Sequence, residues 1–177
     1  MAITFSIDTG HKLDLAQRKK IGELSESFFG QSRDPQQMQV TPKTIKWFMN
    51  NFPKGLNQIL DDDALVGFSM VFLSDEKTMK KFIEGKINEN ELSDYFMENF
   101  GKKKMDCIYL CAALVIPKYQ KRGFATRALV NQITQLGKTY NIKFKNLFYW
   151  GYSDAGTRTA RKISKTLKMP LYVKNCF

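Results

Sequence analysis

The sequence has little that would support a disulfide scaffold, a metal-built fold or a membrane span. Only three of its 177 residues are cysteine, Cys107, Cys111 and Cys176, and their spacing matches no metal-binding motif. An odd number of cysteines favours reduced thiols, as in cytoplasmic proteins. No apolar run reaches the roughly 18 residues of a membrane helix, and residues 1–10 lack the basic stretch and apolar core of a secretory signal. We therefore expect a cytoplasmic protein that binds no metal and does not enter a membrane.

What the sequence does contain is enough apolar residues to build a core. Hydrophobic residues make up 43% of the chain, which excludes a chain that is disordered throughout. The length of 177 residues suits one domain, and no linker, internal repeat or low-complexity tract divides it. We expect a single domain over residues 1–177.

The net charge of +11 is distributed unevenly along the chain. Residues 61–98 carry ten acids and four lysines, a net charge of −6, which leaves +17 for the remainder. Such a split predicts a molecule that is basic on one part of its surface and acidic on another. Two interpretations stay open. The acidic and basic segments form two distinct surfaces of opposite charge, or both are ordinary solvated faces of helices.

The hydrophobic pattern predicts alternating helices and strands, and therefore one α/β domain with a helical insertion at about residues 74–103. Helices are expected at residues 15–28, 42–52, 74–101 (two), 122–140 and 154–168. Strands are expected at residues 56–60, 65–73, 107–116, 146–150 and 171–173. Gly67 lies inside the second of these strands and indicates a bulge or a close backbone approach.

The most informative segment follows the apolar run of residues 107–116, which lacks alternation and therefore predicts a central strand covered on both faces. Pro117 ends that strand, and a basic turn with Gly123 leads directly into a helix. The free N–H groups and positive dipole of a helix start form an anion site, and the glycine lets the backbone approach closely. The turn is neither a Walker loop nor a dinucleotide fingerprint, although an ordinary basic turn remains the alternative.

Gln120-Lys121-Arg122-Gly123-Phe124-Ala125 resembles the Q/R-x-x-G-x-G/A acetyl-CoA signature of the GNAT superfamily of N-acetyltransferases. The resemblance extends over residues 106–168, with Val115-x-Pro117 before the signature and a strand–helix pair after it. It implies a three-layer fold, in which helices flank a mixed, mostly antiparallel sheet that splays open at the strand of residues 107–116. It also implies acetyl-CoA as co-substrate, with its pantetheine amides on the backbone of that strand and its pyrophosphate on the amides of the turn. The residues expected to bind it are Leu114, Val115, Gln120, Lys121, Arg122, Gly123, Phe124, Ala125 and Thr126.

The resemblance is weaker for the residues that would transfer protons. Many members of the family have a tyrosine acid on the last helix, where this chain has Ser164, and some have a glutamate base where this chain has Tyr109. A serine could donate a proton only through a water, and a neutral tyrosine with a reference pKa of about 10 is a poor base. Tyr109 and Ser164 are nevertheless the candidate catalytic residues that the sequence offers.

The resemblance implies an N-acetyltransferase that transfers the acetyl group directly to a primary amine in a ternary complex. The amine would belong to a small molecule or a peptide, and the acidic segment would suit a cationic acceptor if it borders the cleft. The alternative is a catalytically weak acyl-CoA sensor or regulatory module, because the acid and base of the family are missing. Nucleic acid is not expected as a partner, and the protein would be a monomer or a homodimer.

Overall fold

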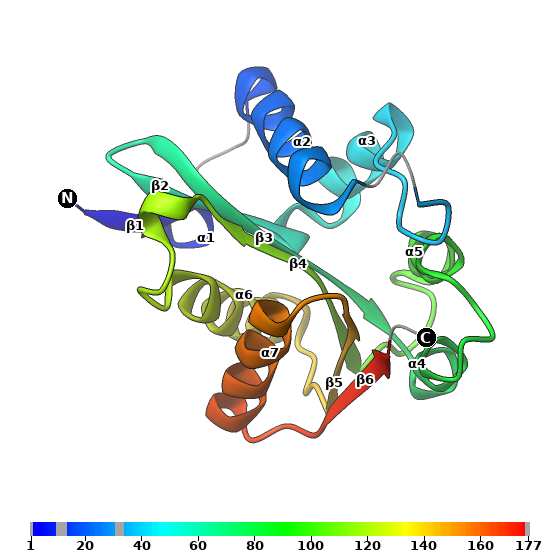
Figure 1. Ribbon diagram of the computed structural model, residues 1–177. Coiled ribbons are helices and arrows are strands. Elements are labelled where there is room, and N and C mark those ends of the chain that lie inside the picture. The colour runs from blue at the N-terminus through cyan, green and yellow to red at the C-terminus, as the bar shows by residue number, and fades with distance from the viewer. Residues whose placement is uncertain (1, 10–13, 31–33, 176–177) are drawn as a thin grey trace.

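The computed structural model describes residues 2–9, 14–30 and 34–175. Within these residues one sheet of six strands has the order β1-β2-β3-β4-β5-β6 (Figure 1). Pairs from β1 to β4 are antiparallel, whereas β4–β5 and β5–β6 are parallel, so the expected mixed, mostly antiparallel sheet is confirmed. The strands are β1 Ile3–Phe5, β2 Leu56–Asp61, β3 Ala64–Ser74, β4 Cys107–Val115, β5 Asn146–Gly151 and β6 Leu171–Asn175.

Helices cover both faces of this sheet (Figure 1). On one side lie α2 (Leu15–Phe29) and α3 (Pro42–Asn51), and on the other lie α6 (Phe124–Tyr140) and α7 (Asp154–Leu167). Two further helices, α4 (Glu76–Ile83) and α5 (Glu89–Asn99), stand between β3 and β4 in the chain, where the sequence predicts them. The short elements are α1 Ser6–Thr9, η2 Pro53–Gly55 and η3 Pro117–Tyr119.

Most of the long helices begin at a side chain that accepts a hydrogen bond from the first turn. These caps are Asp14 for α2, Thr41 for α3, Asp75 for α4, Asn88 for α5 and Ser153 for α7. Each cap satisfies one of the N–H groups that have no partner inside the helix. Among the described helices of eight residues or more, α6 alone begins without one, at Gly123.

The largest buried cluster of the core includes the region where β3 and β4 meet α3 and α5. Aromatic rings dominate it, and Phe72, Phe96 and Tyr109 are almost completely buried. The ring centroids of Phe72 and Tyr109 lie 4.9 Å apart, and those of Tyr109 and Phe148 lie 5.1 Å apart, which is the range of favourable aromatic pairs. Tyr109 is therefore held in one position by rings on both neighbouring strands.

β4 is also the strand at which the sheet splays open. It pairs with β3 along its whole length but with β5 only from Cys107 to Tyr109. Beyond Tyr109, β5 continues alongside β6, and no described strand pairs with that edge of β4 as far as Val115. A β-bulge lies at the same place, since Met70 faces Ala112 while Val71 faces Leu110 and Cys111 is the extra residue.

Gly67 of β3 lies where the backbone of β4 comes close. A Cβ atom there would collide with the carbonyl oxygen of Leu114, and the adjoining register shift in the β2–β3 pairing places a bulge beside it. We expect Gly67→Ala to lower the free energy of unfolding by about 1–3 kcal/mol, as overpacking does. Gly22 of α2 is the matched control, because nothing lies within 4 Å of a Cβ there. Gly22→Ala should raise the free energy of unfolding by about 0.5–1 kcal/mol, since alanine favours a helix more than glycine does. Urea unfolding measures both, and similar shifts would contradict the close approach at Gly67.

No helix among the described residues is long and apolar enough to cross a membrane. Cys107 and Cys111 are free thiols, while Cys176 lies outside the described residues.

Candidate functional site

The unpaired edge of β4 offers backbone groups for an added strand. The N–H of Ile116 donates to the carbonyl of Val66 at 2.9 Å, so this pair is hydrogen-bonded across the β3–β4 ladder. Antiparallel pairs alternate, so the polar backbone groups of Leu114 face β3, whereas those of Ala113 and Val115 face the open edge. Val115 therefore lies where the sequence places a binding residue. Leu114, the other strand residue that the sequence predicts to bind the cofactor, turns its polar backbone groups toward β3, and its neighbour Ala113 faces the open edge instead.

The signature turn is tied to the end of this strand. The side-chain amide of Gln120 donates to the carbonyl of Val115 at 2.9 Å, so Gln120 fixes the turn against β4. Lys121 and Gly123 both have left-handed backbone conformations, with φ of 63° and 78°. This is the conformation that glycine adopts without steric cost, which explains the glycine at position 123.

The turn presents the uncapped first turn of α6. Gly123 is the N-cap residue and no side chain caps this end, so Phe124, Ala125 and Thr126 contribute the N–H groups of an open helix start. In the described part of the chain, every other helix of eight residues or more has a capping side chain in that position. An anion such as a phosphate would satisfy these donors and the helix dipole together.

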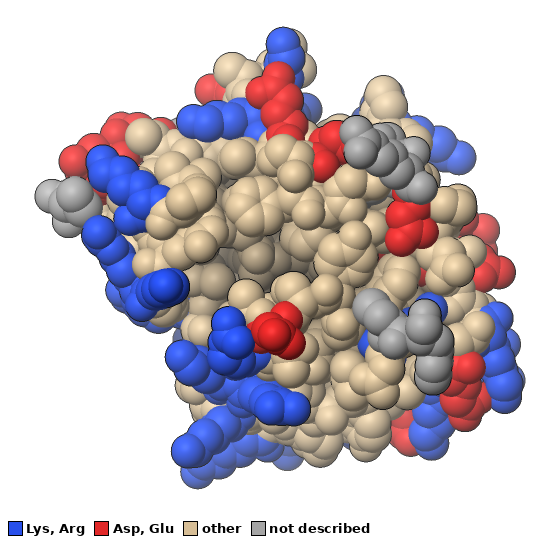
Figure 2. All heavy atoms as spheres, viewed as in Figure 1, with Lys and Arg blue, Asp and Glu red and all other residues tan. Residues whose placement is uncertain are grey.

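Basic side chains surround this helix start. Figure 2 shows Lys and Arg gathered over the turn before α6 and over α7, beside a hollow above β4 that is lined mostly by uncharged residues. The exposed basic residues from η3 to the first residues of α6, and those of α7, include Lys118, Lys121, Arg122, Arg127, Arg158, Arg161, Lys162 and Lys165. This positive field would attract a ligand with several phosphates.

The acidic segment does not form one surface opposite these charges. Asp61, Asp62 and Asp63 lie at the β2–β3 turn, and the hydroxyl of Tyr119 in η3 donates to Asp61 Oδ2 at 2.7 Å. That bond raises the pKa of Tyr119. Most of the other acids of the segment lie on α4 and α5. Among the described residues, Glu89 is the one acid of the segment that accepts hydrogen bonds from side chains of β4.

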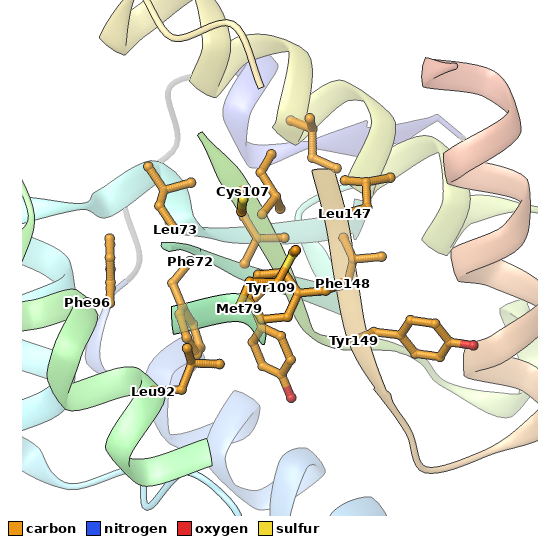
Figure 3. Close-up of a cluster of buried hydrophobic side chains, with 14 of the residues drawn as sticks. Phe72, Leu73, Met79, Leu92, Phe96, Cys107, Tyr109, Leu147, Phe148 and Tyr149 are labelled. Carbon is orange, nitrogen blue, oxygen red and sulfur yellow. The ribbon is translucent and has the colours of Figure 1, made fainter. Parts of the chain in front are cut away.

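Glu89 joins three elements in the interior. Its Oε1 accepts a hydrogen bond from the hydroxyl of Tyr109 at 2.7 Å, and its Oε2 accepts one from the backbone N–H of Met38, also at 2.7 Å. The thiol of Cys111, the bulge residue, donates to Oε1 at 3.7 Å. Figure 3 shows Tyr109 among Phe72, Leu92 and Phe148. The carboxylate is therefore held beside Tyr109 and Cys111, where the pairing of β4 with β5 ends.

Burial controls the ionisation of this group. It raises the pKa of Glu89 above the usual value, although the bonds from Met38, Tyr109 and Cys111 and the charge of Lys174 oppose the rise. Burial and the nearby Glu89 charge raise the pKa of Tyr109 and that of Cys111 well above their ordinary values. Tyr109 thus stays a neutral hydroxyl that donates, and Glu89 is the proton acceptor of the pair. A buried carboxylate with a raised pKa is typical of functional sites.

Ser164 has a different position. It lies near the end of α7, and its hydroxyl donates to the carbonyl of Met169 at 2.7 Å. Met169 lies just beyond the end of α7, so this bond holds the segment that follows the helix against its last turn. The structure therefore brings Tyr109 together with Glu89, whereas the hydroxyl of Ser164 has a local partner.

Comparison with known proteins finds the fold but no close relative. The chain matches no protein-family model, and no curated protein is similar to it in sequence. An aminoglycoside acetyltransferase, meta-AAC0020 from an uncultured soil metagenomic sample, solved with sisomicin, is 14% identical over 93% of this chain and 88% of its own, with a TM-score of 0.54. Arabidopsis thaliana NAA60 with acetyl-CoA is 15% identical over 92% and 86%, with a TM-score of 0.51.

The polyamine N-acetyltransferase of Drosophila melanogaster, which forms N-acetylagmatine, is similar in the same way. It is 12% identical over 94% of this chain and 82% of its own, with a TM-score of 0.52. Identities this low relate only the folds of these proteins. The chain has the fold of the GNAT acetyltransferases.

Proposed function

We propose that this protein is an acetyl-CoA-dependent N-acetyltransferase that transfers an acetyl group directly to a primary amine in a ternary complex. One observation carries the proposal: the open edge of β4 leads through a basic left-handed turn into the uncapped start of α6. An open strand edge binds extended amides, and an open helix start binds phosphates. Pantetheine and pyrophosphate are joined in CoA in this same order.

In this proposal the donor lies along β4 and the turn. The backbone of Ala113 and Val115 would hold the pantetheine amides, and the amides from Lys121 to Thr126 would hold the pyrophosphate. Gln120 keeps the turn in place through its bond to Val115. Lys121 and Arg122, together with the basic face of α7, would supply the positive charge for the remaining phosphate.

The reaction forms a bond between nitrogen and the acetyl carbon and breaks the bond from that carbon to sulfur. Holding the two substrates together supplies much of the rate enhancement. We assign Glu89 as the base that takes the ammonium proton, directly or through one water, and Tyr109 as the donor that orients it. Ser164 remains the candidate acid for the departing thiolate, and it would have to exchange its bond to Met169 for one to a water.

The acceptor would be the amine of a small molecule or of a peptide. The relatives in fold act on aminoglycosides and polyamines, which supports an amine in general. The free thiols of Cys107 and Cys111 suit a reducing compartment, and we propose the cytoplasm and a monomer or homodimer.

A thiol-release assay tests this proposal with purified protein, acetyl-CoA and a panel of primary amines. We expect release of CoA thiol that depends on the amine, with mass spectrometry detecting the acetylated product in equal amount. Binding of CoA without turnover of any amine would favour the acyl-CoA sensor instead. Absence of CoA binding at low salt would overturn both.

A further inference from the structure

A small pocket lies on the face of the sheet that α2 and α3 cover. Its volume is about 80 Å³, and its floor includes Phe68 and Met70 of β3 and Cys111 and Ala112 of β4. Consecutive strand residues normally point to opposite faces, but the bulge turns both Cys111 and Ala112 toward this pocket. The pocket therefore begins where the sheet splays open.

The pocket adjoins the Glu89 carboxylate. Met38 lines the pocket and donates its backbone N–H to Glu89 Oε2 at 2.7 Å. Cys111 also lines it and donates its thiol to Glu89 Oε1 at 3.7 Å. Only one residue, Met38 or Cys111, would thus separate a group in the pocket from the carboxylate that we assign as the base.

Most of the residues that line the pocket are apolar, and one of them is a cation. The walls of the pocket include Ile21 and Gly22 of α2 and Ile45 and Phe48 of α3, and Arg18 is the one charged residue among the described residues that line it. None of the carboxylates among the described residues lines it. A second ammonium of a polyamine would have no counter-charge here, and leaving a buried charge unpaired is costly.

The size of the pocket limits what it can hold. A cavity of roughly 150 Å³ accommodates benzene, so a space of about 80 Å³ suits an aliphatic group of about three or four carbons. The pocket extends from β4 over β3, away from the open edge that faces β5. An acyl group held at that edge would have to pass across β4 to enter it.

We propose that this pocket receives an apolar group of the acceptor, so that the acceptor is a primary amine carrying a short aliphatic chain rather than a polyamine. This inference rests on the proposed function and narrows its substrate. The same chemistry occurs in a free amine and at a peptide N-terminus with an apolar first residue, and the substrate panel separates these two sources.

The test compares amines on the wild-type protein with saturating acetyl-CoA. The panel contains 3-methylbutylamine, methioninamide, a peptide with N-terminal Met, the same peptide with N-terminal Lys, agmatine, spermidine and ethylamine. We expect kcat/KM for the best apolar amine to exceed that for agmatine and spermidine at least tenfold, which is the scale of discrimination in apolar pockets. Preference for methioninamide or for the Met peptide identifies the source.

Filling the pocket gives the structural test. A Cβ at Gly22 has nothing within 4 Å, so the side chain of Gly22→Leu has space to enter the pocket, and leucine favours the helix. We expect this variant to lower kcat/KM for 3-methylbutylamine at least about tenfold while ethylamine and the Kd of CoA change less than about twofold. Ala16→Leu, exposed on the same helix and outside the pocket, is the control. Ala112→Leu fills the pocket from β4 should α2 tolerate no leucine.

The outcomes separate the inference from the proposed function. Calorimetry measures binding of 3-methylbutylamine to the CoA complex, so binding that Gly22→Leu abolishes supports the pocket even without turnover. A preference for spermidine or agmatine would overturn the inference and leave the acetyltransferase activity intact. So would a preference for butyryl-CoA over acetyl-CoA that Gly22→Leu removes, because the pocket would then hold the acyl chain.

Discussion

We expect Glu89→Gln to lower kcat by about 10²–10⁴-fold, the usual contribution of a general base. Glutamine has the same shape and can still accept the bond from the Met38 N–H, but it cannot take a proton. Steady-state kinetics with acetyl-CoA and the best amine measures the effect. The Kd of CoA should stay the same, because the donor site lies on the open edge of β4 and the turn.

The pH dependence provides a second signature of this residue. Burial raises the pKa of Glu89, so the base is ionised only above that raised value, and kcat/KM should rise as pH passes through it. The sign for stability is the opposite. The folded protein holds the proton more tightly than the unfolded chain, so the contribution of Glu89 is fully present below the usual glutamate pKa. It is lost as pH rises through the raised pKa, and Glu89→Gln should remove both effects.

Two further variants show whether Glu89 acts chemically or only holds the fold. Asp94→Asn alters an exposed carboxylate on the same helix and should leave kcat unchanged. Tyr109→Phe removes the hydroxyl that donates to Glu89, which raises the pKa of the carboxylate further and moves the rising limb of the rate profile to higher pH. A Glu89→Gln protein that keeps its kcat and its rising limb would refute the assignment.

Thr126→Glu should strengthen the fold and weaken CoA binding at the same time. Thr126 is the third residue of α6, where a carboxylate would interact with the free N–H groups and the helix dipole. This adds about 0.3–1 kcal/mol to the free energy of unfolding. The same carboxylate competes with a pyrophosphate for these donors, and losing one charge-assisted bond costs about 1.5–3 kcal/mol. We therefore expect the Kd of CoA to increase about 10–100-fold in calorimetry.

Thr126→Gln is the control, since it has nearly the same shape without the charge. Its CoA affinity should stay within about threefold of the wild type, and raising the salt concentration should weaken CoA binding to the wild type more than to Thr126→Glu. Loss of stability together with affinity would mean that the substitution only damaged the helix. Unchanged affinity would place the phosphates elsewhere.

The sequence predicts those elements that have strong local signals. The apolar run of β4, the amphipathic faces of α6 and α7, and the glycine turn between β4 and α6 all follow from residue order, and the structure has them within a few residues of the predicted bounds. β1, with three residues from Ile3 to Phe5, is too short to show any alternation. Its place beside β2 is decided by tertiary pairing alone.

Glu89 could not be found in the same way. In the sequence it is one of ten acids between Asp61 and Glu98. It falls in the polar stretch of residues 85–91 that separates two predicted helices, where nothing distinguishes it from the other acids. Its partners Met38 and Tyr109 lie 51 and 20 positions away. Only the packing of α5 against the sheet shows that this carboxylate, unlike the other acids of α5, is buried.

The extra residue at Cys111 also decides which of the later residues of β4 turn their backbone amides toward the open edge. Downstream of the bulge, odd-numbered Ala113 and Val115 turn their amides toward the open edge. Deleting one residue there would exchange them with their even-numbered neighbours, although composition and length would hardly change. If this strand is grafted into a related scaffold or aligned by similarity alone, the number of residues across the bulge must therefore be kept. Otherwise different amides would face the proposed acetyl-CoA site.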